Sequence, residues 1–480
     1  MKGRFNNMTK SLTNVPIHLR KEDPEPLYAQ IVTALVAAID SGRLAPDTRL
    51  PSIRALAKEL QVNTVTVVTA YRQLEQQGYV WSRVGSGTYV RSAPAAETTR
   101  QIYVPHHGIN FASATPTPEI FPVADFKRLL NQVLDRDGGH AFGYQESQGW
   151  PPLREGMQQY LSENGIDTSV ENIHIISGAQ QGIDLAAKIL VNQGDVIFVE
   201  GPTYHGAVAS FQSRGAKIVP IPLEKDGPDL KSLERQLGRY QPRLFYAMPN
   251  FQNPTGYSYS AQKKQALLDL AQKHQFVIIE DDYLSELSYS GKARKFLKAS
   301  DTGDRVMYIK SFSKILMPGL RLGLLVAPPQ YNQGIGAAKQ FSDISSSGLL
   351  QRTLDLFLRE QSWQEHIQKM KEIYSGRHRA AINAIREHLP KEIQFSPPEG
   401  GLHLWLKLSS GLSGDELYRR CLREDILITP GSYFAPNSRY RQWFRLSYAA
   451  VTQEQISRGI ALMGKIIREI DTPHTIQPLL

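Results

Sequence analysis

The sequence contains one cysteine among 480 residues and no long apolar run. Cys421 alone cannot form an internal disulfide or a cysteine-based zinc cluster, so a disulfide scaffold is excluded and no metal site is expected. The longest apolar stretch, Ile31 to Ile39, is far shorter than the ~20 residues that a membrane helix needs. Met1 to Lys10 is polar and has no apolar signal core. We therefore expect a cytoplasmic protein that does not enter a membrane.

Several nucleotide-binding and repeat signatures are also missing. The sequence has no P-loop, no complete Gly-x-Gly-x-x-Gly motif and no internal repeat. What is present is an ordinary globular composition, with 41% hydrophobic and 21% charged residues. The length exceeds the ~250–300 residues at which a single core stops growing, so at least two domains are expected.

The positive charge is concentrated near the amino end. Residues 1–95 contain twelve Lys and Arg against seven Asp and Glu, whereas the remaining residues contain 43 against 39. More than half of the formal charge of +9 therefore lies in a fifth of the chain. This placement suggests that the amino-terminal part meets a polyanion, although the solvated surface of a small domain would carry such a charge too.

The pattern of hydrophobic residues divides the chain. A stretch rich in Pro, Ala, Thr and Gly predicts a linker over residues 92–109, between domains at 20–91 and 110–472. In the second part, short apolar runs alternate with amphipathic segments such as Gln262 to Lys273, which is typical of buried parallel strands with crossover helices. The predicted class is α/β, with a mostly parallel sheet between helices. The strands are expected at 173–176, 196–199, 218–221, 244–248, 276–279, 306–309 and 322–327.

The first domain reads as helices followed by a hairpin. Apolar residues every four positions from Leu27 predict a helix that ends near Gly42, and Ser52 is a suitable N-cap for a second helix. The six residues from Thr64 to Thr69 are all β-branched, which by propensity alone predicts a strand. Asn63 as a possible N-cap and the helical spacing of the apolar residues as far as Leu74 favour a helix instead. Residues 79–90 predict a two-stranded hairpin with a glycine turn.

These elements resemble the winged helix-turn-helix of GntR-type regulators over about residues 25–91. The resemblance implies that the third helix enters the major groove of DNA, with Asn63, Thr64 and Thr66 near its amino end facing bases and phosphates. It also implies that Arg54 contacts the DNA backbone and that Gly85 brings the wing close to the duplex. Many relatives carry arginine at the position of Thr64, so contacts with thymine methyl groups are expected here instead.

In the second domain, Lys314 follows an expected strand within Ser-Phe-Ser-Lys. A lysine among apolar residues at a strand end can be partly neutral, as imine formation with an aldehyde requires. Ser311, Ser313 and Arg321 are suited to bind a phosphate, and residues 177–182 follow a strand and open a helix, which predicts a second anion cup. The Ser-x-x-Lys spacing also occurs in β-lactamase-like acyl enzymes, but the Ser-Asp-Asn and Lys-Thr-Gly motifs of that class are absent.

Two more segments follow expected strands: residues 249–256, which contain Asn-Pro-Thr-Gly, and Glu280-Asp281-Asp282-Tyr283. Ligands of open α/β sheets bind beyond the carboxyl ends of the strands, so these segments are expected to share one site. An aspartate there can keep a pyridine nitrogen protonated, and Asn and Tyr can hydrogen-bond a ring oxygen.

With these motifs in order, residues 110–470 resemble a fold-type I pyridoxal-phosphate (PLP) enzyme of the aspartate aminotransferase class. The resemblance implies that Lys314 forms the Schiff base with PLP and that Asp281 binds the pyridine nitrogen, with Asp282 or Glu280 as alternatives because the spacing to Tyr283 departs from the usual one. Arg445 would clamp an effector carboxylate. Tyr144 would reach the phosphate of the neighbouring subunit of a homodimer. The remaining implied cofactor contacts are Gly178, Ala179, Gln180, Tyr204, Asn253, Tyr283, Ser311, Ser313 and Arg321.

The two domains together resemble the MocR/GabR family of bacterial regulators. The resemblance implies a PLP-dependent transcription regulator that binds double-stranded promoter DNA and senses an amino compound or PLP itself. The alternative is a catalytically active aminotransferase that carries a DNA-binding domain. The pattern leaves open whether an amino effector is an α-, ω- or D-amino acid.

Overall fold

The computed structural model describes residues 17, 19, 26–40, 43–44, 48–76, 79–83, 87–90, 108–291, 295–360, 362–409, 411–434 and 438–471. The chain divides into two compact units, Met1–Pro105 and His106–Leu480. Almost all of the expected linker, 92–109, lies outside the described residues. Ile109, which the sequence placed at its end, begins strand β3 (Ile109–Asn110), which pairs with β14 (Ile426–Leu427) of the larger unit.

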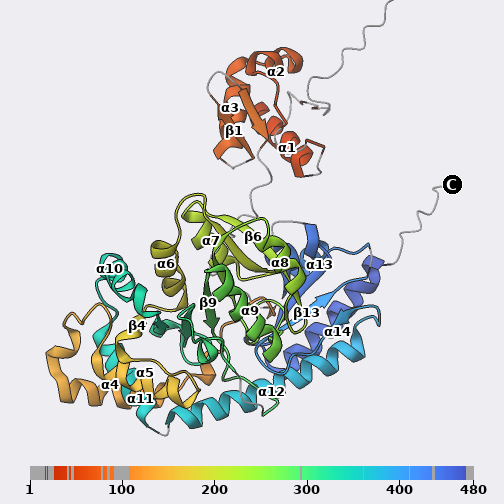
Figure 1. Cartoon of the computed structure of the whole chain (residues 1–480). Coiled ribbons are helices and arrows are strands. Elements are labelled where there is room, and N and C mark those ends of the chain that lie inside the picture. The colour runs from red at the N-terminus through yellow and green to blue at the C-terminus, as the bar shows by residue number, and fades with distance from the viewer. Residues whose placement is uncertain are drawn as a thin grey trace, which may run out of the picture. The chain divides into compact units, whose positions relative to one another are not determined.

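The smaller unit contains the three expected helices, drawn in red and orange in Figure 1. They are α1 (Leu27–Asp40), α2 (Ile53–Leu60) and α3 (Thr64–Gln76). The Ser52 hydroxyl caps α2 by accepting from the Ala55 N–H at 3.3 Å. The β-branched run at the start of α3 is helical because the Asn63 carboxamide oxygen accepts from the Val65 N–H at 3.0 Å, and because the apolar face of α3 is buried. Packing of that face outweighs the strand propensity.

The hairpin of the smaller unit is also present. Strands β1 (Val80–Arg83) and β2 (Gly87–Val90) pair antiparallel, and the rings of Trp81 and Tyr89 stack on it at 5.0 Å. Gly85 is outside the described residues, so its expected approach to DNA stays a prediction. Together with the three helices, the hairpin completes a winged helix-turn-helix.

The larger unit is built on an eight-stranded sheet in the order β4-β11-β10-β9-β8-β5-β6-β7. Neighbours among β5, β6, β8, β9 and β10 pair in parallel, whereas β11 and β7 run antiparallel to their neighbours. All seven expected strands are present, in a sheet that is mostly parallel as predicted. The strands are β4 (Ile173–Ile176), β5 (Val196–Gly201), β6 (Lys217–Glu224), β7 (Gly227–Pro228), β8 (Pro242–Ala247), β9 (Val277–Asp282), β10 (Val306–Ser311) and β11 (Gly323–Val326).

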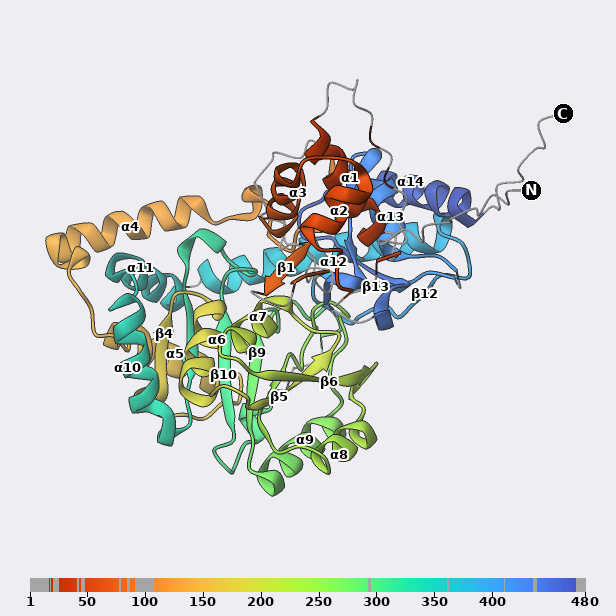
Figure 2. The ribbon, with the colours of Figure 1, turned by 90° about the horizontal axis from the view of Figure 1, so that it is seen from above.

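Helices cover both faces of this sheet, as Figure 2 shows. Alternate strand residues pack into different cores: Ile197 and Ile279 lie in the core with α6 and α7, whereas Phe198 and Ile278 lie in the core with α8 and α9. This alternation follows from the two-residue period of a strand, and it produces three layers. The helices on the two faces are α6 (Ala179–Leu190), α7 (His205–Ser213), α8 (Leu230–Leu237) and α9 (Ala261–His274).

A smaller antiparallel sheet, ordered β12-β13-β16-β15, forms the carboxy-terminal part of the larger unit. Long helix α12 runs between α11 and α14 in Figure 1. Among the described residues, no helix is long and apolar enough to cross a bilayer. The strands are β12 (Gln394–Phe395), β13 (His403–Lys407), β15 (Thr429–Pro430) and β16 (Trp443–Ser447), and the remaining helices are α4 (Val123–Asp137), α5 (Pro151–Glu163), α10 (Asn332–Asp343), α11 (Gly348–Arg359), α12 (Ser362–His388), α13 (Gly414–Arg423) and α14 (Gln453–Asp471).

Candidate functional site

Lys314 lies in the turn directly after β10 and is half-buried. Its Nζ lies 3.4 Å from the Thr115 hydroxyl. Burial and, to a smaller extent, the positive charges of Arg445 and Arg321 together lower the pKa of Lys314 to about 8. The side chain is therefore partly neutral near physiological pH, which is the state in which an amine attacks an aldehyde.

An anion cup forms where β4 leads into α6. Gly178 has a φ of +89°, which favours glycine, and a Cβ added there would lie 2.6 Å from Nη2 of Arg321. That same Nη2 donates to the Ser177 carbonyl at 2.8 Å. Ala179 and Gln180 begin α6 next to Gly178, and the first N–H groups of a helix have no partner within it. A guanidinium and a helix N-terminus thus meet at one point.

Ser311 and Ser313, which are also expected at the phosphate, come from the end of β10, and Tyr204, which is expected to stack on the cofactor ring, comes from the start of α7. Ser311 ends β10 and is buried, and its hydroxyl accepts from the N–H of Ser313 at 3.3 Å. Tyr204 precedes α7, and its hydroxyl donates to Gln180 at 3.1 Å. The Tyr204 hydroxyl therefore contacts a residue of the cup, while Ser311 and Ser313 bond to each other at the end of β10.

The three acids at the end of β9 have different partners. Glu280 accepts from the backbone N–H groups of Leu297 at 2.9 Å and Lys298 at 2.8 Å, and burial raises its pKa to about 7. Asp282 accepts from Lys310 at 2.9 Å. Although burial acts to raise it, Lys310 and the hydroxyls bound to Asp282 hold the pKa of Asp282 below its usual value. Both acids are fully engaged by the scaffold.

Asp281 is the acid with a free oxygen. Its Oδ2 accepts from the Tyr246 hydroxyl at 2.6 Å, while its buried Oδ1 has no hydrogen-bond partner among the described residues. Burial raises the pKa of Asp281 to about 6. An unpartnered buried carboxylate oxygen is costly unless a ligand completes it, and a protonated pyridine nitrogen is such a ligand.

Asn253 and Tyr283 come from the two loops beside Asp281. The Tyr283 hydroxyl donates to the Phe251 carbonyl at 2.6 Å, and the Asn253 side-chain oxygen accepts from Arg445 Nη1 at 2.8 Å. Buried Glu200 positions the first loop, because its Oε2 accepts from the Gln252 amide at 2.9 Å. A core carboxylate thus fixes the residue next to Asn253.

Arg445, on β16, is buried without an acidic partner among the described residues. Its Nη2 donates to the Ala112 carbonyl at 2.6 Å and to the Thr429 hydroxyl at 3.2 Å, whereas its buried Nε has no partner within the same set of residues. Burial lowers its pKa to about 10, so the guanidinium remains charged at neutral pH. A buried cation without a counter-ion attracts an anionic ligand group.

Several site residues escaped sequence analysis. Thr115 and Ala112 come from the segment after β3, Tyr246 is on β8, Thr429 is on β15 and His403 begins β13. None belongs to a recognisable motif. Tyr246 and His403 are polar residues within apolar runs, and that position is the one sequence signal that could have pointed to them.

The residues expected to contact DNA lie at the start of α2 and α3. Arg54 and Thr64 are exposed, whereas Thr66 is half-buried. Asn63 is exposed, and its carboxamide oxygen is occupied by the helix cap, since it also accepts from the Thr64 hydroxyl at 3.3 Å. Val65 lies between the threonines with 65% of its surface exposed. The start of α3 therefore offers methyl groups to a ligand.

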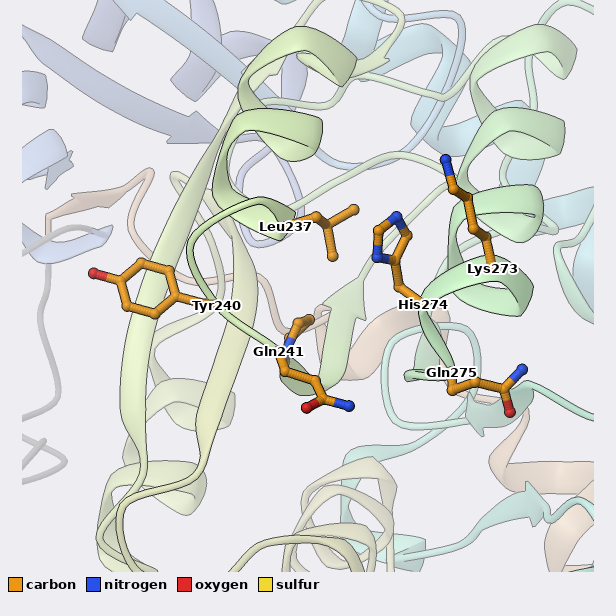
Figure 3. Close-up of a pocket in the computed structure, with 7 residues that line it drawn as sticks. Leu237, Tyr240, Gln241, Lys273, His274 and Gln275 are labelled. Atoms are coloured by element: carbon orange, nitrogen blue, oxygen red, sulfur yellow. The ribbon is translucent and has the colours of Figure 1, made fainter.

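A pocket elsewhere in the larger unit is unrelated to this site. It lies between the ends of α8 and α9 beside Tyr240, His274 and Gln275, as Figure 3 shows. Pro242, which begins β8, lines it, so it is at the amino-terminal edge of the sheet. Ligands of such sheets bind at the opposite edge, where Lys314 and Asp281 lie.

Comparison with known proteins identifies both units. Residues 107–462 match the family model of aminotransferase class I and II, and residues 27–90 match that of bacterial regulatory proteins of the gntR family. The HTH-type transcriptional regulator YdfD of Bacillus subtilis is 31% identical, over 93% of this chain and 97% of its own length. A probable rhizopine catabolism regulatory protein, MocR, of Rhizobium meliloti is 30% identical, over 92% and 94%.

The chain belongs to the MocR family of transcription regulators. This MocR-family protein is also similar in structure to the α-aminoadipate aminotransferase LysN of Thermus thermophilus, complexed with N-(5'-phosphopyridoxyl)-L-leucine, with a TM-score of 0.71 and 33% identity. That likeness covers 76% of this chain and 92% of LysN, so it leaves out the DNA-binding unit that the MocR-type relatives share. The protein is a PLP-dependent, DNA-binding transcription regulator. Lys314, the free oxygen of Asp281 and the cup at Gly178 fit the cofactor.

Proposed function

We propose that the larger unit senses an amino compound that carries a carboxylate, and that its binding changes the affinity of the protein for promoter DNA. The observation that carries this proposal is buried Arg445, which has no acidic partner among the described residues and whose charge reaches Lys314. An amine-binding group and an anion-binding group at one site match the two ends of an amino acid.

Each part of the cofactor has an assigned holder. Bound PLP supplies an aldehyde for the lysine amine and an electron-accepting ring. Lys314 would provide that amine, Asp281 would stabilise a positive charge at the pyridine nitrogen, and Tyr204 would contact the ring. Asn253 and Tyr283 bind the ring oxygen. The phosphate is held by Gly178, Ala179, Gln180, Ser311, Ser313 and Arg321.

Tyr144 supports assembly as a homodimer. It follows α4 and is 85% exposed, with exposed Phe142 beside it. Large exposed apolar side chains of this kind mark interaction surfaces. In the dimer, Tyr144 would reach the phosphate of the neighbouring subunit. The two DNA-binding units bind repeated half-sites. The residues that contact the duplex are Arg54, Asn63, Thr64, Thr66 and Gly85.

The second candidate is an aminotransferase that also binds DNA. It is favoured by the complete set of Lys314, Asp281 and Arg445, which turnover would need. Sensing does not require turnover. It requires only that the effector bind two conformational states of the protein with different affinities, because a ligand with equal affinity for both does not shift the equilibrium between them.

One experiment separates the two functions. Purified holoprotein is titrated with a panel of α-, ω- and D-amino acids and amines, while the visible spectrum, promoter affinity and keto-acid product are followed. A single spectral change with altered promoter affinity and no accumulating product supports the sensor. Sustained product over many turnovers with unchanged promoter affinity supports the enzyme and refutes the sensor.

A further inference from the structure

His403 is a buried histidine with two unused nitrogens. It begins β13, is fully buried, and neither Nδ1 nor Nε2 has a hydrogen-bond partner among the described residues. Other buried histidines differ, since a nitrogen of His366 lies 2.8 Å from the Ile315 carbonyl and one of His174 lies 3.2 Å from Asn332. A buried polar atom without a partner destabilises the folded state, so a histidine with two such atoms points to a missing ligand.

The position of His403 directs it to the effector site. In the pairing of β13 with β16, His403 lies opposite Ser447 and Trp405 lies opposite Arg445. Directly opposite residues share a face, and so do residues two apart on one strand, so His403 and Arg445 project from the same face as diagonal neighbours. The His403 ring stacks on Tyr283 at 6.3 Å with an interplanar angle of 24°.

The charge around His403 favours an anion. Burial lowers the pKa of His403 well below its usual value, and the positive charges of Arg445 and Lys314 lower it further. The ring is therefore neutral at physiological pH, with one N–H donor and one acceptor nitrogen. Within the described part of the chain, the charged groups that act on it are both cations.

Arg445 leaves room for a second donor. Its guanidinium has five N–H groups, of which Nη1 serves Asn253 and Nη2 serves Ala112 and Thr429. An ionised carboxylate has about four acceptor sites, more than the two N–H groups that remain can fill. A neighbouring imidazole N–H supplies another bond.

We infer that His403 is a specificity-determining residue of the effector site, where its neutral imidazole donates a hydrogen bond to the carboxylate that Arg445 binds. The inference rests on the proposed function and adds a second contact that distinguishes an amino acid from the amine that lacks its carboxylate. A site that hydrogen-bonds a ligand group rejects the analogue without it, because the donors are then left unpaired.

The test compares matched ligands on full-length holoprotein. His403→Phe keeps an aromatic ring against Tyr283 and removes both nitrogens, whereas His403→Gln retains a donor and an acceptor. The probes are L-leucine with 3-methylbutylamine, L-phenylalanine with 2-phenylethylamine, and γ-aminobutyrate with propylamine. Binding is measured by calorimetry, and the visible spectrum of each variant reports its cofactor.

For the pair that wild type binds, we expect His403→Phe to reduce the preference for the acid over the amine by about tenfold, as loss of one hydrogen bond to a charged group predicts. The amine affinity and the cofactor spectrum should stay unchanged, and His403→Gln should restore part of the preference. If His403→Phe does not fold, His403→Met provides the same comparison with an apolar chain of similar size.

An unchanged preference in His403→Phe would overturn the inference, as would equal weakening of acid and amine, which would mean a purely structural role. If the wild-type protein prefers none of the acids to its amine, the proposed function itself is wrong. That outcome is distinguished from failure of the His403 inference because it is seen in the wild-type protein alone.

Discussion

Asp281 and Asp282 are adjacent on β9, yet their carboxylates serve opposite faces of the large sheet. Asp281 accepts from the Tyr246 hydroxyl and has one oxygen without a partner among the described residues, whereas Asp282 accepts from Lys310, Ser285 and the Tyr308 hydroxyl. Successive strand residues face opposite ways, so one residue is available to a ligand and the next stabilises the scaffold.

Matched substitutions at these two positions should therefore behave differently. Asp281→Asn should weaken PLP binding by about tenfold or more, since a hydrogen bond to a charged group contributes ~1.5–3 kcal/mol, while changing stability little. Asp282→Asn should lower the free energy of unfolding by about 3–5 kcal/mol, because it leaves buried Lys310 with Glu286 as its remaining acid. PLP affinity by fluorescence and denaturant unfolding of the apoprotein measure the two effects. The reverse pattern would assign the pyridine nitrogen to Asp282.

The pH dependence of cofactor uptake should follow Lys314. Its pKa of about 8 lies below the usual lysine value, so the neutral amine fraction increases as the pH rises through 8 and is nearly complete above 9. The rate at which apoprotein gains visible absorbance with PLP should rise over that range. Arg445→Met removes a nearby positive charge and should move the midpoint to higher pH. A midpoint near 10.5 in wild type would contradict the lowered pKa.

Covalent attachment can be tested directly at Lys314. Borohydride treatment of holoprotein should fix a pyridoxyl group to the peptide that contains Lys314, as detected by mass spectrometry. Lys314→Ala should lose this adduct and the visible absorbance of wild type, with an unchanged far-ultraviolet circular dichroism spectrum. Buried Lys310 serves as an internal control, because Asp282 and Glu286 hold it charged. An adduct on Lys310 would refute the assignment.

In the smaller unit, Arg54 is expected to contact phosphates. Arg54→Ala should weaken binding to promoter and unrelated DNA alike, and should reduce the slope of log affinity against log salt by about 1. Fluorescence anisotropy at several salt concentrations measures both effects. A loss of sequence preference with affinity retained would indicate base contact instead.

Asn63 has a capping role that can be separated from DNA contact. Asn63→Ala removes the acceptor of the Val65 N–H and should destabilise the smaller unit by about 1 kcal/mol, as judged by thermal unfolding. Asn63→Asp keeps that acceptor and should retain stability, but its negative charge should weaken DNA binding. If both variants bind DNA as wild type does, Asn63 is a cap alone.

Much of this molecule could be predicted from its sequence because its signals are local. Each motif of the cofactor site directly follows an apolar strand, and the carboxyl ends of parallel strands meet at one edge. The helical assignment of α3 depended on the Asn63 cap and on an apolar face whose burial the structure confirms.

Choices between faces and partners were beyond sequence analysis. Strand alternation separates Asp281 from Glu280 and Asp282, but which face meets the ligand depends on the helices that pack there. The contacts of Ala112, Thr115 and His403 arise from segments that are distant in sequence. Only the folded chain brings them beside Lys314 and Arg445.

The bond between Arg445 and the Ala112 carbonyl has a mechanical consequence. Ala112 lies two residues beyond β3, near the beginning of the described part of the larger unit. In the proposed function, a bound effector carboxylate shares this guanidinium with the Ala112 carbonyl. In the proposed function, binding of a carboxylate at Arg445 therefore acts on the segment that follows the predicted linker.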